Sequence, residues 1–415
     1  MLDSMIVNQH VDDTAFLHAM RMTLARAPHA RLKDLGRFDD RLAAHIDGLL
    51  VSGEKAWKSC TAALAASTAS TLFTAAVLAI EDRAKDRLNQ LYALTEAVPD
   101  TQSGLVSAFG WVEQRQLRGT VVSLLASSNA YLRLLGIKVC AIHRVDAGQI
   151  RDAITEASNF SLCATALRTV GELGRRDLLP QCIRMLDAED SACRFWAAWS
   201  AVLLGNRSAG LKCLMDMSEI PEPLRLRAFR LLMQTMDQHD AHAWLSNCAK
   251  TPENLRFLIE GAGIVGDPSY LPWLIQQMTN PKTARLAGEA FSLITGLDLV
   301  NSDMERKPPD GGDAGPTDDP EDPNVETDPD DGLPWPDPNR ISRWLEVNGS
   351  RFESGTRYFL GAGVTRENCI MALKDGYQRQ RILAAHYLCL LEPGTVLFEW
   401  RAPAYRQQRL LAAMH

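Results

Sequence analysis

Two short clusters in this sequence carry residue types that could bind a metal ion. In His239-Asp240-Ala241-His242, two imidazoles lie three residues apart beside a carboxylate, and on a helix both would share one face. Residues 328–332, Asp-Pro-Asp-Asp-Gly, alternate carboxylates ahead of a glycine, as a calcium loop does. The first cluster has no third ligand nearby, and the second lacks the glutamate that closes a calcium loop. We therefore expect surface features here, with no bound metal or cofactor.

No familiar catalytic motif accompanies these clusters. The sequence has no HExxH, no GxSxG, and neither GxxxxGKS nor GxxxxGKT. Gly171-Glu172-Leu173-Gly174 has closely spaced glycines, but it follows a predicted helix rather than a strand, so it is not a nucleotide-binding fingerprint. The nine cysteines stand singly, mostly among apolar residues, and are expected to be reduced thiols of the core. The sequence therefore predicts a protein without enzymatic activity.

Aromatic and arginine clusters supply the candidate residues for binding a partner. Aromatic side chains bury large areas at interfaces, and guanidinium groups pair with carboxylates through two parallel hydrogen bonds. The candidates are Phe195, Trp196 and Trp199; Arg225, Arg227 and Arg230; and Arg379, Arg381, Arg401, Tyr405 and Arg406. A plainer interpretation exists for each group: packing between helices for the aromatics, a solvated helix face for the first arginines, and sealing of the last repeat for the C-terminal cluster.

An internal repeat indicates which elements position these residues. Residues 170–180 match residues 262–272 in their glycines, a leucine and a proline, an offset of about three periods of about 31 residues. Steps of this period from Gly174 mark seven positions: Glu81, Val112, His143, Gly174, Gly205, Met236 and, one residue early, Gly266. Apolar or small residues precede these marks at the spacing of one helix face. Each mark is therefore predicted to lie at the turn that ends the first helix of a pair.

A helix pair of this size cannot bury its own apolar face, so stacking on neighbouring pairs must complete the core. The predicted fold is all-α, an α-solenoid of HEAT-like helix pairs with seven pairs between about residues 70 and 299. The glycines suit turns with positive φ, and Pro180 and Pro272 suit the first turn of a second helix. A compact bundle is the alternative, but it does not predict a constant period.

Four segments are predicted along the chain. Residues 1–69, with helices over 12–27 and 38–66, form a helical N-terminal cap, and residues 70–300 form the repeat array. Residues 301–332, rich in Asp, Pro and Gly, are expected to be a disordered, solvated and self-repelling linker. Residues 333–415 form a helical C-terminal unit, in which Asp337 is expected to cap a helix that starts at Pro338.

The charge of the chain is distributed unevenly. Residues 301–332 hold twelve acidic residues against Arg306 and Lys307, a net charge of −10, and subtracting this from the total of −7 leaves +3 for the remaining chain. No run of five basic residues occurs, which disfavours nucleic-acid binding. No apolar stretch is long enough to span a bilayer, and the N-terminus does not resemble a signal peptide. We expect a cytoplasmic protein that does not insert into membranes.

Three strings of the sequence carry a resemblance to a known family: LAGEAFSLITGLD (residues 286–298), LPWPDP (333–338) and RAPAYRQQR (401–409). They resemble an uncharacterised proteobacterial family with HEAT-like repeats that is often encoded beside type VI secretion clusters. The resemblance covers most of the chain, with the acidic segment as a variable insertion. It implies an accessory or adaptor protein for a secreted effector, or an immunity protein against a toxin, and it supplies no catalytic residues.

These observations together predict a non-catalytic scaffold that holds a protein partner: a secretion effector, a toxin or a component of the secretion machinery. One alternative is a HEAT-like DNA glycosylase that binds damaged DNA in a concave groove, which requires a carboxylate and aromatic rings in a basic cleft. A neutral or acidic concave face would eliminate it. A bilin-lyase-like repeat protein is a third possibility. The sequence leaves open the identity of the partner, the choice between adaptor and immunity protein, and the oligomeric state.

Overall fold

The computed structural model describes residues 2–156, 159–216, 220, 222–309 and 328–414. These residues are mostly α-helical, with one antiparallel pair of two-residue strands, β1 (Tyr358–Phe359) and β2 (Ala362–Gly363). The prediction of an all-α protein is confirmed. The chain forms two compact units: unit 1 comprises residues 1–26, 30–221 and 392–415, and unit 2 comprises residues 27–29 and 222–391. This division does not test the four predicted segments, whose boundaries stay predictions.

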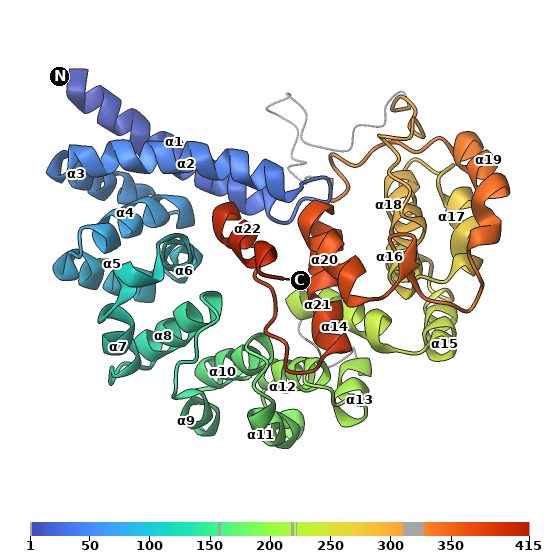
Figure 1. Ribbon diagram of the computed structural model, residues 1–415. Helices are drawn as coiled ribbons and strands as arrows, with labels where there is room; N and C mark the ends of the chain where they lie inside the picture. Colours follow the sequence, from blue (N-terminus) through green and yellow to red (C-terminus); the bar gives the residue numbers. More distant parts are fainter. Residues whose placement is uncertain (1, 157–158, 217–219, 221, 310–327, 415) are drawn as a thin grey trace. The chain divides into compact units, whose positions relative to one another are not determined.

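Unit 1 contains a row of helices that pack on one another in the order of the sequence (Figure 1). Each helix of this row contacts the next: α4 (Ala69–Glu81), α6 (Gln102–Trp111), α8 (Ala130–Ile142), α10 (Phe160–Glu172) and α12 (Ser191–Leu203). A second, mostly shorter helix follows each of them: α5 (Lys85–Ala97), α7 (Thr120–Leu125), α9 (Ile150–Thr155), α11 (Leu179–Arg184) and α13 (Ala209–Met215). Helices therefore alternate along the chain as the repeat predicts.

The N-terminal helices of unit 1 pack against the start of this row. They are α1 (Leu2–Leu24), α2 (Leu32–Ser52) and α3 (Glu54–Ala63), and each of the three contacts α4. The predicted helices are present with the expected break at Gly53, although the first begins at Leu2 rather than at residue 12 and the second at Leu32 rather than at residue 38. α22 (Ala404–Ala412) also belongs to unit 1 and contacts α2.

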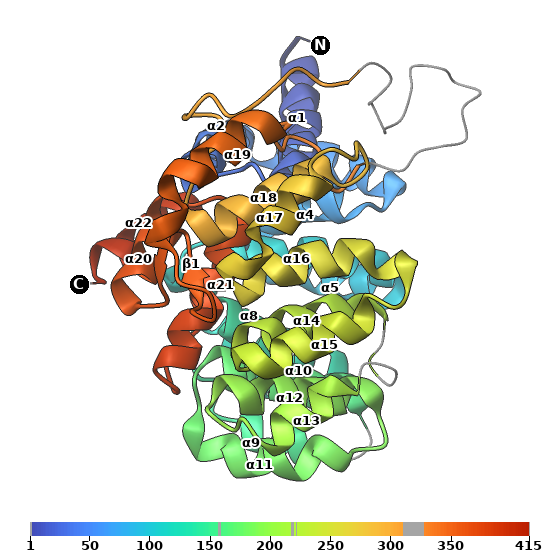
Figure 2. The ribbon, with the colours of Figure 1, turned by 90° about the vertical axis from the view of Figure 1, so that its right-hand side faces the viewer.

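Unit 2 has a row of the same kind (Figure 2). Its first helices are α14 (Glu222–Thr235), α16 (Leu255–Val265) and α18 (Ala284–Thr295), and each contacts the next; α15 (Gln238–Cys248) and α17 (Leu271–Gln277) alternate with them. Three further helices complete the unit: α19 (Pro338–Asn348), α20 (Arg366–Asp375) and α21 (Gln378–Leu391). Asp337 caps α19 as predicted, because its carboxylate accepts hydrogen bonds from the backbone N–H groups of Asn339 and Arg340.

The period of the sequence is produced by signals that start and end the first helices. All seven marked positions lie at or within two residues of the C-terminal end of α4, α6, α8, α10, α12, α14 or α16. Gly174, Gly205 and Gly266 have positive φ values of 64°, 100° and 75°, as a turn after a helix requires. At the other end, side chains of Thr68, Asn129, Asn159 and Asp190 accept hydrogen bonds from the first turns of α4, α8, α10 and α12.

Two glycines of the repeat have a different role from the one predicted. Gly171 and Gly263 lie inside α10 and α16 rather than in turns. A Cβ atom on Gly171 would lie 2.9 Å from the Cα of Ser200 in α12, and one on Gly263 would lie 2.9 Å from the Cα of Ala290 in α18. Neighbouring first helices approach so closely at these points that glycine is needed on one of them.

An extended segment crosses the C-terminal ends of the first helices in each unit. In unit 1 this is the C-terminal strap, residues 392–403: the N–H of Leu397 donates to the carbonyl of Glu172 at 2.9 Å. In unit 2, the N–H of Tyr358 donates to the carbonyl of Gly266 at 2.9 Å, and that of Leu360 to the carbonyl of Leu293 at 2.7 Å. The last carbonyls of a helix have no partner inside the helix, so both segments satisfy acceptors that the row leaves open.

Part of the predicted linker lies against unit 2. Residues 310–327 are outside the described residues. Asp330 is 3% exposed, and its two carboxylate oxygens accept hydrogen bonds from Arg256 of α16, both at 2.8 Å. Asp328 pairs with Arg285 of α18. The expectation of a solvated tether is wrong for these two residues, because arginines of the helix row provide the opposite charge.

Candidate functional site

A cavity of about 460 Å³ in unit 1 is the strongest candidate for a functional site. Its walls come from α1, α4, α6, α8 and α10 and from the C-terminal strap. Five of the lining residues are cationic and two are carboxylates, and we call the cavity the cationic pocket. The cationic residues are Arg21, Arg26, Lys138, Arg168 and Arg401, and the carboxylates are Glu172 and Glu399.

Arg21 fixes the C-terminal strap at one edge of the pocket. Its Nε pairs with Asp39 of α2, and its Nη2 donates to the carbonyls of Arg401 and Ala402, both at 3.1 Å. Asp39 in turn accepts a hydrogen bond from the N–H of Ala404 at 2.6 Å. This buried pair therefore places Arg401 at the pocket, although Arg401 lies hundreds of residues further along the chain.

The two carboxylates of the pocket are held by arginines. Glu172 accepts hydrogen bonds from Arg168 at 2.7 Å and from Arg144 at 3.2 Å, and Arg144 also reaches Glu399 at 2.9 Å. Burial acts to raise the pKa of Glu172, but Arg168 and Arg144 outweigh it, and the net shift is downward. Both acids are thus tied to guanidinium groups, and Glu172 is favoured in its ionised form.

Three cations of the pocket have no such anionic partner. No described residue forms an ion pair with Arg26, Lys138 or Arg401. The Nε of Arg401 is buried and donates to no acceptor among the described residues. Burial lowers the pKa of Lys138, with a further contribution from Arg168, and burial also lowers the pKa of Arg401, although Glu399 acts to raise it. Lys138 and Arg401 are half-buried and Arg26 is exposed, so part of the positive charge at the pocket is shielded from water without an ion-pair partner.

Aromatic rings and hydroxyl groups complete the walls. His18 stacks on Phe73 with ring centroids 4.0 Å apart, and its two ring nitrogens lie 3.0 Å and 2.8 Å from the hydroxyls of Ser70 and Ser107. Burial, with a smaller effect of Arg21, lowers the pKa of His18 to about 3, so the imidazole is neutral near pH 7. Trp111 adds a second ring to the lining. The pocket thus combines cationic groups with a flat, uncharged wall.

The predicted aromatic patch is not at the surface. Phe195, Trp196 and Trp199 of α12 are all buried, with exposed fractions of 2%, 8% and 2%. The guanidinium of Arg168 lies 4.9 Å from the ring centroid of Trp196, so this ring supports one cation of the pocket from behind. The expectation that these three residues contact a partner is wrong; they pack between helices because their large rings fill the space between neighbouring pairs.

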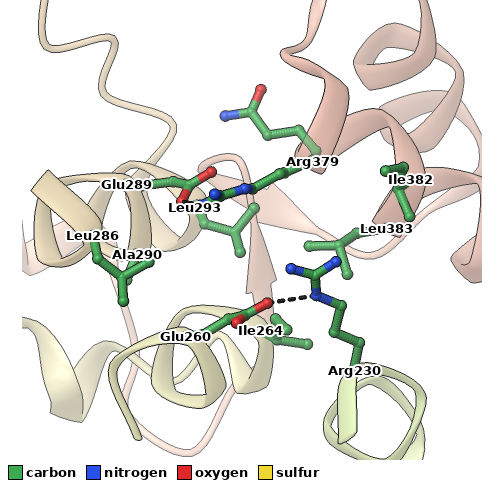
Figure 3. Close-up of a pocket in the computed structure, with 11 residues that line it drawn as sticks. Arg230, Glu260, Ile264, Leu286, Glu289, Ala290, Leu293, Arg379, Ile382 and Leu383 are labelled. Carbon is green, nitrogen blue, oxygen red and sulfur yellow. Dashed lines mark hydrogen bonds and ion pairs between the residues drawn. The ribbon is translucent and has the colours of Figure 1, made fainter. Parts of the chain in front are cut away.

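The predicted arginines of unit 2 have intramolecular partners or lie half-buried. Arg230 pairs with Glu260 at 2.5 Å and Arg379 with Glu289 at 2.5 Å around a cavity of about 30 Å³, which has room for about one water molecule (Figure 3). Arg225 and Arg227, on α14, are half-buried. Carboxylates of the chain itself therefore occupy the positions that a partner was expected to fill at Arg230 and Arg379.

The C-terminal candidates separate into structural and lining residues. Arg381 is fully buried and donates to the carbonyl of Leu373, and Arg406 is buried and donates to the carbonyls of Gly110 and Val112 at the end of α6. The expectation that these two meet a partner is wrong, since helix carbonyls use their donors. Tyr405 is 43% exposed. Arg401 is the one predicted residue that lines the cationic pocket.

The other chemical candidates have local explanations. His242 contacts Asp267 at 3.0 Å and the hydroxyl of Tyr270 at 2.9 Å, which accounts for its position. Among the described residues, no three His, Cys, Asp or Glu side chains are placed to hold a metal ion. The nine cysteines are free, and most are buried. Burial raises the pKa of the Cys60 and Cys182 thiols to about 12, which keeps them protonated.

Comparison of the chain with family models, curated proteins and solved structures gave no match. None of the described helices is long and apolar enough to cross a membrane. The case for a function therefore depends on the geometry of the cationic pocket and of the helix rows.

Sequence reasoning missed most of the pocket. Lys138 carried one signal, since it is the one charged residue in the otherwise apolar run of residues 134–142. A charged residue within the buried stripe of a helix is rarely fully exposed, so this position could have been selected. Arg26 and Arg168 lie on ordinary polar faces, and nothing in their spacing relates them to Arg401.

Proposed function

We propose that this protein is a non-catalytic binding scaffold, an α-solenoid of HEAT-like helix pairs that holds a protein partner. The observation that carries the proposal is the row of first helices that contact one another in each unit, and the charged groups of the cationic pocket bear only on the absence of catalysis. Glu172 and Glu399 are fixed by Arg144 and Arg168, so neither is free to act as a general base, whereas three cations remain available to attract negative charge. Such a site suits binding better than proton transfer.

The order of the helices supports the scaffold. Within each unit the first helices contact one another in sequence order, so each row extends over several helix pairs. Repeat proteins use such rows as extended binding surfaces. The resemblance to a family encoded beside type VI secretion clusters supplies the proposed partner class: an effector, a toxin or a component of the secretion machinery, with this chain as adaptor or immunity protein.

The experiment is a capture of partners from the native host with the full-length chain as bait. Recovery of one secretion-linked protein, lost when the corresponding locus is deleted, is the expected result. Deleting the gene for this chain then distinguishes the two roles: an immunity protein leaves cells sensitive to the toxin of their neighbours, and an adaptor leaves one effector unexported. Capture that recovers no secretion-linked protein contradicts the proposal.

A HEAT-like DNA glycosylase remains the second candidate, because the pocket does contain cations, aromatic rings and carboxylates together. The ion-paired state of both carboxylates argues against it. Incubation of the protein with a duplex that contains alkylated bases tests the point directly. Release of free base favours the glycosylase, and an intact duplex removes it.

A further inference from the structure

The cationic pocket has the properties of a site built for an anion. Arg26, Lys138 and Arg401 line one cavity without an ion-pair partner among the described residues. Bringing like charges together in a partly buried place costs free energy, and a bound anion relieves that cost. Burial and, to a smaller extent, neighbouring arginines lower the pKa values of Lys138 and Arg401, and Glu399 offsets part of this effect at Arg401.

Arg401 gives a second, independent indication. Its Nε is buried and has no acceptor among the described residues, and such orphaned donors are rare in folded proteins. The position of Arg401 is fixed by two contacts. Arg21 donates a hydrogen bond to its backbone carbonyl, and its guanidinium carbon lies 6.0 Å from the ring centroid of Trp400. An oxyanion in the pocket would supply the acceptor that this donor lacks.

The size and walls of the pocket favour a small molecule over a side chain of a protein partner. About 460 Å³ lies within the range of small-molecule sites, and one carboxylate side chain would leave most of it empty. A single carboxylate would also neutralise one charge of three. The half-buried Trp111 provides ring surface, since the ring of Phe73 is buried beneath His18, and Ser103, Ser107 and Thr165 provide hydroxyl groups in the same lining.

We propose that the cationic pocket binds a small organic phosphate, with its phosphate between Arg401, Lys138 and Arg26 and its flat body against Trp111. Phosphate carries about two negative charges near neutral pH and offers three acceptor oxygens, which matches a cluster of three cations better than a monocarboxylate does. The ligand goes beyond the proposed scaffold function, because it binds to this chain whether or not a protein partner is present.

Other basic places on the molecule lack this combination. A larger cavity of about 710 Å³ beside α5 and α7 is lined by Arg83, Lys85, Arg115 and Arg118, but all four side chains are exposed and water can solvate them. The arginines of the small cavity in unit 2 are paired with Glu260 and Glu289. At the cationic pocket, by contrast, two of the three unpaired cations, Lys138 and Arg401, are half-buried, and Arg26 alone of the three is exposed.

Calorimetric titration of the full chain with adenosine 5′-monophosphate tests the proposal, with adenosine and inorganic phosphate as the two halves of the probe. We expect the nucleotide to bind more tightly than either half. Arg401→Gln and Lys138→Gln should each weaken binding about tenfold or more, as loss of a charge-assisted contact does. Arg401→Lys, which keeps the charge, should retain part of the affinity. Arg37→Gln is the matched control, since it removes one charge from an exposed side chain of the same unit.

Three outcomes overturn the proposal: absence of binding by the nucleotide and by phosphate, equal binding by wild type and both glutamine variants, and binding of a glutamate-rich peptide at Arg401 in place of the nucleotide. The last result assigns the pocket to a protein partner. Partner capture with Arg401→Gln keeps the two proposals separate. If this variant loses nucleotide binding but still captures the protein partner, the result supports the small ligand. If the wild type captures no partner, the result contradicts the scaffold proposal alone.

Discussion

At the scale of single residues, the charged groups of this protein are of two kinds. Most arginines singled out by the sequence use their donors on carboxylates or on helix-end carbonyls of the same chain, as Arg379, Arg381 and Arg406 do. Arg401 and Lys138 do not, and this difference distinguishes a binding site from a structural contact. Residue type alone could not make the distinction, because the partners come from distant parts of the chain.

His18 makes the stability of the protein depend on pH. Its pKa of about 3 lies below the ordinary value of 6.5, so its contribution is complete above pH 6.5 and is lost as the pH falls towards 3. One such group steepens the dependence by up to about 1.4 kcal/mol per pH unit. We expect His18→Gln, whose amide can still bond to Ser70 and Ser107, to flatten the curve between about pH 6 and pH 4.

Urea unfolding at a series of pH values measures this slope. The exposed His239→Gln is the control and should leave the curve unchanged. Part of the slope should remain in the His18 variant, since burial also lowers the pKa of His386 to about 3. Superimposable curves for wild type and His18→Gln contradict the assignment.

At the scale of helices, close approach between neighbours depends on small residues. Alanine in place of glycine inside a helix normally stabilises a protein by about 0.5–1 kcal/mol. We expect the opposite sign for Gly171→Ala, a loss of about 1–3 kcal/mol, because the new Cβ would lie 2.5 Å from the Ser200 hydroxyl and 2.9 Å from its Cα. Ser161→Ala, at an exposed position of the same helix, should be neutral or slightly stabilising. A stabilised Gly171 variant, measured by urea unfolding, is incompatible with this packing.

The sequence predicted the helices well and the pocket poorly, for identifiable reasons. The helix ends could be predicted because glycines such as Gly174 and Gly266 and caps such as Asp337 act locally. Gly171 was assigned to a turn because the sequence does not reveal whether a glycine is needed for a positive φ or for close packing of two helices. Arg401 was selected by residue type, but its neighbours Lys138 and Arg168 are brought to it by the strap, which no local pattern encodes.

At the scale of the whole molecule, unit 1 is completed by residues from the end of the described chain. Arg144 donates to the carbonyl of Leu397 at 2.7 Å, and Arg406 donates to the carbonyls of Gly110 and Val112. Ending the chain after Leu391 removes these contacts, and the carbonyls of Gly110 and Val112 lose the donors that Arg406 provides. We expect faster hydrogen exchange in α6, α8 and α10, with little change in α16 and α18 of unit 2.

Mass-spectrometric hydrogen exchange resolves the two units separately. A chain that ends after Ala412 is the control, because it keeps the strap and all of α22. If α8 and α10 are as well protected in the chain that ends after Leu391 as in the chain that ends after Ala412, the strap does not stabilise the row.

The position of the strap at residues 392–403 also determines when unit 1 can be completed during translation. Helices α8 and α10 are synthesised more than two hundred residues before Leu397 and Arg401. Unit 1 therefore lacks its C-terminal strap while unit 2 is being synthesised. Lys138 and Arg168 exist early, but the wall that encloses them arrives late. A chain that ends before Glu392 therefore lacks one wall of the cationic pocket, and the proposed ligand would find its complete site only after the strap has been made.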